Sequence, residues 1–255
     1  MTALHTSRYE RNRIYISAEV QKQLKRFRVL LAGCGIGSMI AECALRMGFE
    51  NITLVDGDKV ELTNLNRQNY GMADIGTSKV EALQKRLLAI NPDANITVHN
   101  DFITNENLGS LVESHDVAVN ALDFDTDIPF RFDELCQSRN IPILHPYNLG
   151  WAGLVYLVMP RGSNLRSLSA DYRQFEKAAV QYLLEQLENK PHTREWLSRV
   201  LSEYASEGGV MSPPQLPTGS YLLAGSCAHL LYKIAVGASV KAFPEFYLFG
   251  LEDNV

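Results

Sequence analysis

Short β-prone segments alternate with helical segments through the first 145 residues, and this alternation restricts the fold more than any other feature. The β-prone segments are apolar runs that cover 28–33, 51–56, 96–99, 116–120 and 141–145. Helical periodicity lies between them, over 38–47, 78–90 and 131–138. Strands joined by helices pair in parallel, with helices over both faces of the sheet. We therefore predict an α/β fold with a Rossmann-like, mostly parallel sheet.

The pattern changes after Gly150. A longer strand is predicted, and then two charged helices separated by Pro191, a Gly- and Pro-rich loop, an apolar helix and a closing strand. In that order the segments are 153–159, 171–188, 193–204, 208–217, 219–236 and 245–251. We interpret 161–217 as a helical insertion within a single domain that covers 1–255.

Charge and composition exclude several classes of function. A formal charge of −5 and a pI near 5.7 argue against non-specific nucleic-acid binding. We interpret the one basic cluster, around Lys22 to Arg28, as the solvated end of a helix that buries Leu24. The polar N-terminus does not resemble a signal peptide, and no apolar run is long enough for a membrane span. Because the four cysteines form no C-x-x-C pair, a cytoplasmic protein with reduced thiols is expected.

A glycine-rich loop joins the first strand to its helix. It reads Gly33-Cys-Gly-Ile-Gly-Ser38, and Asp56 ends the next strand 23 positions after Gly33. Glycines let the backbone approach a phosphate, a helix N-terminus attracts it, and an acidic residue at this distance accepts from a ribose hydroxyl. We count Gly33, Gly35 and Gly37 as nucleotide-binding residues. The dinucleotide pattern G-x-G-x-x-G is not met, because Gly37 comes one position early, but an NAD- or FAD-binding oxidoreductase remains open.

Polar residues after the second strand favour a triphosphate. Asn64, Arg67 and Gln68 lie in the loop that follows Asp56, and Lys79 begins the next helix. Cations are needed where charge builds on a departing pyrophosphate, whereas a diphosphate bridge needs none. Asp123, after the fourth strand, is suited to hold Mg²⁺ on the phosphates. The sequence therefore favours ATP with Mg²⁺.

Three motifs resemble those of the ThiF/MoeB/ubiquitin-activating-enzyme superfamily. The stretch 56–68 resembles D-x-D-x-V-x-x-S-N-L-N-R-Q, Arg8-Tyr9-Glu10-Arg11 resembles R-Y-x-R, and 75–79 resembles V-G-x-x-K. The resemblance covers roughly 8–160 and 213–240, and the first motif is highly specific. It implies adenylation of a carboxylate, such as the C-terminus of a ubiquitin-like or sulfur-carrier protein.

The resemblance also implies roles for single residues. Asp56 would bind ribose, Asp123 would ligate Mg²⁺, and Arg11 would reach the phosphates of the partner subunit in a homodimer. Asn64, Arg67 and Lys79 would grip the phosphates. Three further positions are counted with the nucleotide site because they belong to or adjoin the motifs: Asp58, Gln68 and Leu122.

Departures from the family pattern qualify these expectations. The glycine loop is one residue short, and the family's T-D-N reads Leu122-Asp123-Phe124. The zinc-binding C-x-x-C pairs of many relatives are missing, so no zinc site is expected. No cysteine lies in 161–217, which favours adenylation without covalent transfer. Two alternatives stay open: a catalytically degenerate nucleotide-binding scaffold, and a scaffold whose insertion recruits a partner.

Overall fold

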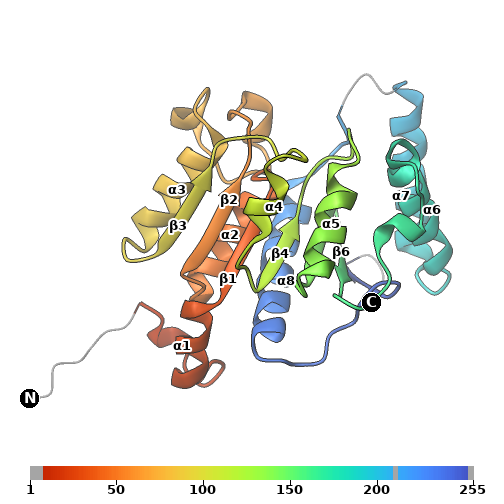
Figure 1. Cartoon of the computed structure of the whole chain (residues 1–255). Helices are drawn as coiled ribbons and strands as arrows, with labels where there is room; N and C mark the ends of the chain where they lie inside the picture. The colour runs from red at the N-terminus through yellow and green to blue at the C-terminus, as the bar shows by residue number, and fades with distance from the viewer. Residues whose placement is uncertain (1–7, 209–211, 252–255) are drawn as a thin grey trace, which may run out of the picture.

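A seven-stranded sheet forms the centre of the molecule, with helices on both of its faces (Figure 1). The structure is a computed structural model that describes residues 8–208 and 212–251. The strands are β1 (Arg28–Ala32), β2 (Asn51–Val55), β3 (Asn95–His99), β4 (Val117–Asn120), β5 (Ile143–Asn148), β6 (Gly153–Val158) and β7 (Phe246–Phe249). The helices are α1 (Ala18–Arg26), α2 (Ile36–Met47), α3 (Lys79–Ile90), α4 (Leu108–Val112), α5 (Ile128–Ser138), α6 (Tyr172–Gln186), α7 (Pro191–Ser206) and α8 (Pro217–Ala235). Short 3₁₀ turns occur at η1 (Glu10–Asn12), η2 (Leu62–Asn64), η3 (Met72–Asp74) and η4 (Leu165–Ser167).

The strand order is β3-β2-β1-β4-β5-β6-β7. The first five strands are parallel, and β6 and β7 are antiparallel to their neighbours. Because the chain passes from β3 on one edge to β4 beside β1, the strand order reverses between β1 and β4. A crevice at the carboxyl ends of the strands is the usual ligand site at such a point. The predicted Rossmann-like fold is confirmed.

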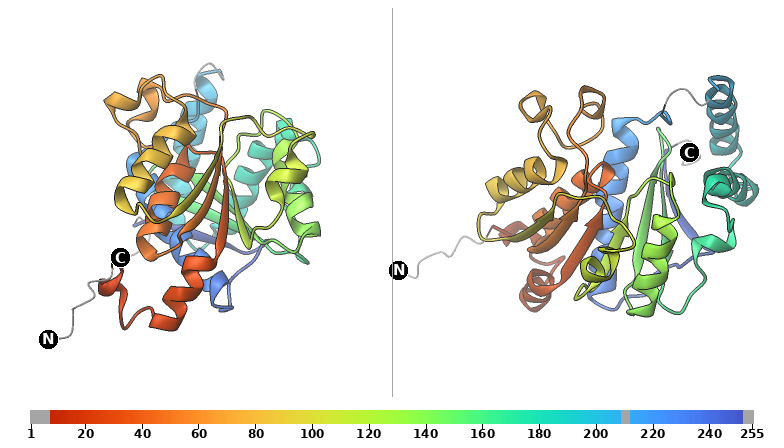
Figure 2. Two further views of the ribbon diagram at one scale, coloured as in Figure 1. Left: turned by 60° about the vertical axis from the view of Figure 1, so that its left-hand side comes forward. Right: turned by 45° about the horizontal axis from the view of Figure 1, so that its top comes forward.

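Alternate residues of each central strand face two separate hydrophobic cores. In β1, Val29 and Leu31 face the core that α2, α3 and α8 cover, whereas Leu30 and Ala32 face the core under α4 to α7. The two layers of helices are visible on either side of the sheet in Figure 2. Burial on both faces explains why the strands read as unbroken apolar runs rather than alternating ones.

The inserted helices α6 and α7 belong to the second core. Phe175, Leu183 and Leu197 are buried there with Tyr156 of β6 and Phe130 of α5. Pro191, which was expected to separate the two helices, occupies the first turn of α7, where its missing N–H costs no hydrogen bond. The single-domain interpretation is compatible with this shared core and stays a prediction for unfolding experiments.

Helix boundaries differ little from those expected. α2 begins at Ile36, two residues before the predicted start, and the expected helix around Lys22 to Arg28 is α1, with Leu24 buried. The five residues of α4 were missed because one and a half turns are too short to show helical periodicity. Within the described residues, no helix is both long and apolar enough to span a bilayer.

Candidate functional site

The glycine loop lies at the carboxyl end of β1, beside the segment that follows β4. Gly33 has φ +91° and its N–H donates to Val55 O at 2.9 Å. A Cβ added at Gly33 would lie 2.4 Å from Ala121 O, so only glycine fits there. At Gly35 it would lie 3.3 Å from Gln68 Nε2, and at Gly37 its nearest neighbour would be at an ordinary 3.6 Å. The first turn of α2 follows at once, and its backbone N–H groups give this edge of the sheet the character of an anion site.

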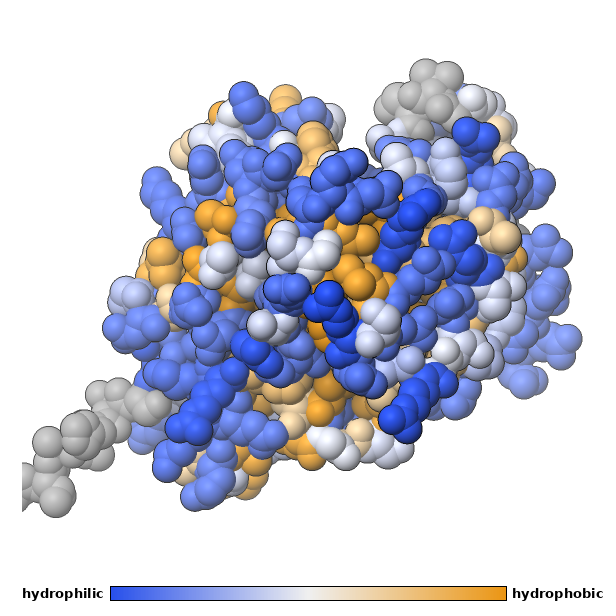
Figure 3. Space-filling view, viewed as in Figure 1, coloured by the Kyte–Doolittle hydropathy of each residue, from blue (hydrophilic) through white to orange (hydrophobic). Residues whose placement is uncertain are grey.

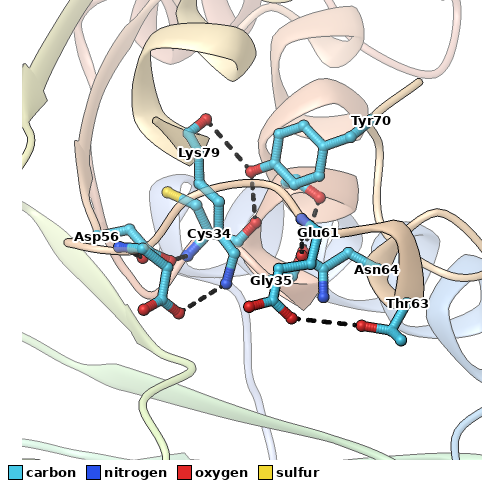
Figure 4. Close-up of polar contacts among 10 residues, drawn as sticks. Cys34, Gly35, Asp56, Glu61, Thr63, Asn64, Tyr70 and Lys79 are labelled. Carbon is cyan, nitrogen blue, oxygen red and sulfur yellow. Dashed lines mark hydrogen bonds and ion pairs between the residues drawn. The ribbon is translucent and has the colours of Figure 1, made fainter. Parts of the chain in front are cut away.

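Asp56 joins the carboxyl ends of β1 and β2. Its Oδ2 accepts from Cys34 N at 2.6 Å and its Oδ1 from Asp58 N at 2.8 Å (Figure 4). Each carboxylate oxygen has a second lone pair, so Asp56 can still accept a hydroxyl donor such as that of a ribose. The acidic residue expected from the sequence therefore also fixes the glycine loop in position.

Lys79, the first residue of α3, is almost fully buried. Its Nζ lies 2.8 Å from Asp58 Oδ2, and Figure 4 shows its side chain passing beside Cys34. Tyr70 supports the arrangement, because its hydroxyl lies 2.7 Å from Cys34 O and 3.3 Å from Lys79 O. Burial, aided by the nearby Cys34 and Asp56, raises the pKa of Tyr70 far above its usual value, so the phenol remains a donor. No sequence motif or spacing predicted Tyr70 as a residue of this site.

Arg67 is half-buried at the same edge and is held by three oxygens. Its Nη1 donates to Thr63 O and Asn66 Oδ1, both at 2.9 Å, and its Nε donates to Gln215 Oε1 at 2.5 Å. Burial lowers the pKa of Arg67 and the negative charge of Asp123 acts to raise it, so the two side chains share one electrostatic environment. Gln215, close to the start of α8, was not predicted as a site residue.

Asn64 and Gln68 shape the loop between these groups. The Oδ1 of Asn64, which is buried, accepts from Glu61 N at 2.9 Å and closes the turn η2. The amide of Gln68 lies against Gly35, and its buried Oε1 has no hydrogen-bond partner among the described residues. Asn64 therefore has a structural task in this loop, while Gln68 keeps an unused acceptor beside the glycine loop.

Asp123 follows β4 and shares its surroundings with other acidic side chains. Its pKa is raised, first because burial penalises the charged form and then because Asp125, Asp58 and Asp56 repel it, with Lys79 acting in the opposite direction. Residues that are far apart in sequence thus meet at the point where the strand order reverses. Their excess of carboxylate oxygen favours a small cation there.

The donor set suits Mg²⁺ that shares its ligands with phosphate. Mg²⁺ takes one or two carboxylates together with phosphate oxygens and water, rather than an all-protein cage. In residues 8–208 and 212–251 no three His, Cys, Asp or Glu side chains are grouped so as to hold a metal alone. Asp123 is the carboxylate that would hold Mg²⁺, and the ion would neutralise phosphate charge in this crevice.

The two neighbours of Asp123 explain one departure from the family pattern. Leu122 N lies 3.4 Å from Asn120 Oδ1, which anchors the loop to the end of β4. The ring of Phe124 packs against Phe175 of α6, with centroids 4.1 Å apart, and both rings contact Phe130. An aromatic residue therefore replaces the expected polar one where the inserted helix rests on this loop.

Arg11 is the predicted site residue that the fold does not bring to the crevice. It is exposed in η1, and the adjacent Asn12 donates to Met47 O at the far end of α2. α2 starts at the glycine loop, at the carboxyl ends of the strands. Because η1 contacts the last residue of α2, it lies near the amino ends of the strands. In Figure 1 this segment is the red turn near α1. Arg11 cannot serve the site of its own chain in this arrangement.

Comparison with known proteins identifies the family. A model of the ThiF family matches residues 9–251. The chain belongs to the ThiF family. It is 32% identical over 162 residues to the sulfur carrier protein ThiS adenylyltransferase of Bacillus subtilis, covering 61% of this chain and 48% of that protein. It is 30% identical over 173 residues to the molybdopterin-synthase adenylyltransferase of Haemophilus influenzae, covering 66% and 71%. The family resemblance inferred from the motifs is confirmed.

Solved structures agree on the fold. The crystal structure of Escherichia coli MccB with ATP superposes with a TM-score of 0.70 at 18% identity, covering 98% of this chain and 72% of that chain. The chain spans about half the length of the Bacillus relative and about a third of the tRNA threonylcarbamoyladenosine dehydratase of Escherichia coli.

Proposed function

We propose that this chain binds Mg²⁺-ATP in the crevice between Gly33 and Asp123 and adenylates a carboxylate. The observation that carries the proposal is the meeting of two cations, Arg67 and Lys79, with Asp56 and Asp123 at the end of the sheet beside the first turn of α2. A nicotinamide or flavin dinucleotide gives these two cations and Asp123 no task.

The proposed reaction needs no nucleophile from the protein. A carboxylate oxygen of the acceptor attacks the α-phosphorus, the bond to the bridging oxygen breaks, and pyrophosphate departs with the electron pair. Arg67, Lys79 and the N–H groups of α2 stabilise the growing charge on pyrophosphate. Asp123 would hold Mg²⁺, which would supply further positive charge at the phosphates. Asp56 positions the ribose, so that orientation and charge neutralisation supply most of the rate enhancement.

For the acceptor we propose the C-terminal carboxylate of a small ubiquitin-like or sulfur-carrier protein, or of a peptide. Support comes from the names of the relatives, one of which adenylylates a sulfur carrier protein. In the space-filling view, the upper margin of the molecule is indented between the part that carries α3 and the part that carries α7, and the residues at the base of the indentation are mostly blue and hydrophilic (Figure 3). We propose that an extended polypeptide tail reaches the crevice through this indentation. We place the reaction in the cytoplasm.

We also propose that the active form is a homodimer. Ile14 and Tyr15, just after Arg11, are 95% and 86% exposed, and Ile14 has φ +78°, which is strained for a β-branched residue. Burial of this turn against a second copy would offset the strain and the exposure. The same contact would carry Arg11 to the phosphates of the partner subunit.

Two substitutions test the site assignment. Arg67→Ala and Asp123→Asn should each lower acceptor-dependent pyrophosphate–ATP exchange by about 100-fold or more, because each removes a charge that acts on the departing pyrophosphate. Arg194→Ala, an exposed arginine on α7, is the matched control and should exchange like the wild type. Candidate small proteins and peptides with free C-termini serve as acceptors. Wild-type exchange in Arg67→Ala or Asp123→Asn refutes the assignment.

The alternative functions predict different results in ligand-binding and pyrophosphate–ATP exchange measurements. An oxidoreductase would bind nicotinamide or flavin, and ATP would fail to compete. A degenerate scaffold would bind ATP tightly, and no acceptor would support exchange. Deleting 161–217 to test partner recruitment would expose the second core, so substitutions on the outer faces of α6 and α7 are the better probe.

A further inference from the structure

The three oxygens that hold Arg67 are all uncharged. They belong to the backbone of Thr63, the amide of Asn66 and the amide of Gln215. In the described part of the chain no carboxylate forms an ion pair with this guanidinium, and its hydrogen bonds use Nε and Nη1. The hydrogen bonds therefore orient the guanidinium of Arg67, but no carboxylate neutralises its positive charge. Nη2 remains available for an anion.

Gln215 is the contact that reaches Arg67 from a distant part of the sequence. Its side chain accepts from Arg67, and its backbone O accepts from Asn66 Nδ2 at 3.2 Å. The next residue is fixed in turn, because Leu216 O accepts from Asn148 Nδ2 at 2.8 Å at the end of β5. Contacts from Arg67, Asn66 and Asn148 thus hold the two residues that directly precede α8.

We propose that Gln215 is a positioning residue that aims the guanidinium of Arg67 at the β- and γ-phosphates while leaving its charge unneutralised. A carboxylate at the same position would hold Arg67 equally well but would cancel much of its attraction for phosphate. A small apolar residue would leave the charge intact and free the side chain to move. This inference rests on the phosphate-binding role proposed for Arg67.

Two substitutions of Gln215 separate the orientation of the Arg67 guanidinium from the effect of a negative charge beside it. Gln215→Glu keeps the shape and the acceptor and adds one negative charge, and Gln215→Ala removes the acceptor and adds none. Binding of adenosine, AMP, ADP and ATP, each with Mg²⁺ and without acceptor, is measured by calorimetry. For Gln215→Glu we expect the Kd of ATP to rise about tenfold or more, that of ADP to rise less, and those of AMP and adenosine to stay unchanged. Gln215→Ala should weaken ATP binding a few-fold.

The order of the two variants decides between positioning and simple packing. If Gln215 only braced the loop, Gln215→Glu would preserve that hydrogen bond and bind ATP better than Gln215→Ala. That order, or a uniform loss across all four ligands, overturns the proposal. Gln181→Glu on the exposed side of α6 adds the same charge elsewhere and should bind like the wild type.

A failure of this inference differs from a failure of the proposed function. If the wild type binds no ATP, the proposed function falls and this inference falls with it. If the wild type binds ATP and Gln215→Glu binds it equally well, only the role of Gln215 is refuted. Melting temperatures of both variants show whether the fold is intact, and the phosphate-dependent gradient cannot arise from unfolding, which would affect adenosine as well.

Discussion

At Gly33 the backbone takes a conformation that L-residues disfavour, and the carbonyl of Ala121 fills the space where a Cβ would stand. Gly37 meets neither condition, because it lies in the first turns of α2 and a Cβ there would make an ordinary contact with Leu31. The three glycines of the loop, equivalent in the sequence motif, therefore carry different constraints.

Alanine substitutions should reveal this difference in stability. We expect Gly33→Ala to lower the free energy of unfolding by about 2–4 kcal/mol, because it adds a left-handed alanine and a steric clash. Gly76→Ala, at φ +82° with open space around it, isolates the conformational part and should cost about 1–2 kcal/mol. Gly37→Ala should be neutral or stabilise by about 0.5–1 kcal/mol. Urea denaturation measures all three. Equal losses at Gly33 and Gly76 would contradict the clash.

Sequence reasoning works best for residues that follow the parallel strands. The neighbourhood of Asp56 and Asp123 could be predicted because the carboxyl ends of adjacent strands meet at one edge of the sheet. The contacts of Tyr70 and Gln215 could not, since each joins segments whose separation in sequence follows no period. For Arg11 the fold gives the position, and the role proposed for it requires a second chain.

Between elements, the partly buried carboxylate of Glu42 connects α2 to α3 and to Asn69, which follows the 56–68 motif. It accepts from Arg86 Nε and Asn69 Nδ2, both at 2.5 Å, and forms an ion pair with Arg46 at 2.8 Å. Burial acts to raise the pKa of Glu42, but these hydrogen bonds and charges outweigh it and lower the pKa below its usual 4.5. This junction fixes α2 relative to α3. It therefore also fixes the distance between the glycine loop and Lys79, which lie at the N-termini of these two helices.

Glu42→Gln should therefore destabilise the protein in a pH-dependent way. At pH 7 we expect a loss of about 1–3 kcal/mol, because charged hydrogen bonds become neutral ones. A carboxylate whose pKa is lower in the folded state stabilises above the unfolded pKa and loses that effect as pH falls through the folded pKa. The difference from the wild type should thus narrow as pH falls below 4.5. Glu81→Gln, exposed on α3, is the control for urea titrations at pH 7 and pH 4, and a difference that stays constant between them would contradict this account.

The elements themselves were largely predictable, and the exceptions have physical reasons. The strands could be predicted from apolar runs, because both of their faces are buried. The long helices could be predicted from helical periodicity, because one of their faces is buried. The packing of α6 on the loop after β4 was not foreseeable. It depends on a contact between Phe124 and Phe175, whose ring centroids lie 4.1 Å apart, and no sequence pattern links these two residues.

On the scale of the whole molecule, the inserted helices share the second hydrophobic core with one face of the sheet, which predicts a single unfolding transition. Trp196 of α7 is 9% exposed and Trp151, in the β5–β6 turn, is 56% exposed. In Trp151→Phe, the remaining tryptophan reports on the insertion alone. We expect its fluorescence and the circular dichroism at 222 nm to change at the same temperature. Trp196→Phe gives the reciprocal probe, and separate midpoints would divide the chain into two units.

The length of α2 has a consequence for how the proposed enzyme would respond to its own abundance. Twelve residues at 1.5 Å each place about 18 Å between the glycine loop and the turn that holds Arg11. If a complete site requires that arginine, a lone chain holds none, and two chains together hold two. Turnover per chain would then rise with total protein and level off once pairing is complete. Dilution alone would act as an off switch, with no change in ATP or acceptor.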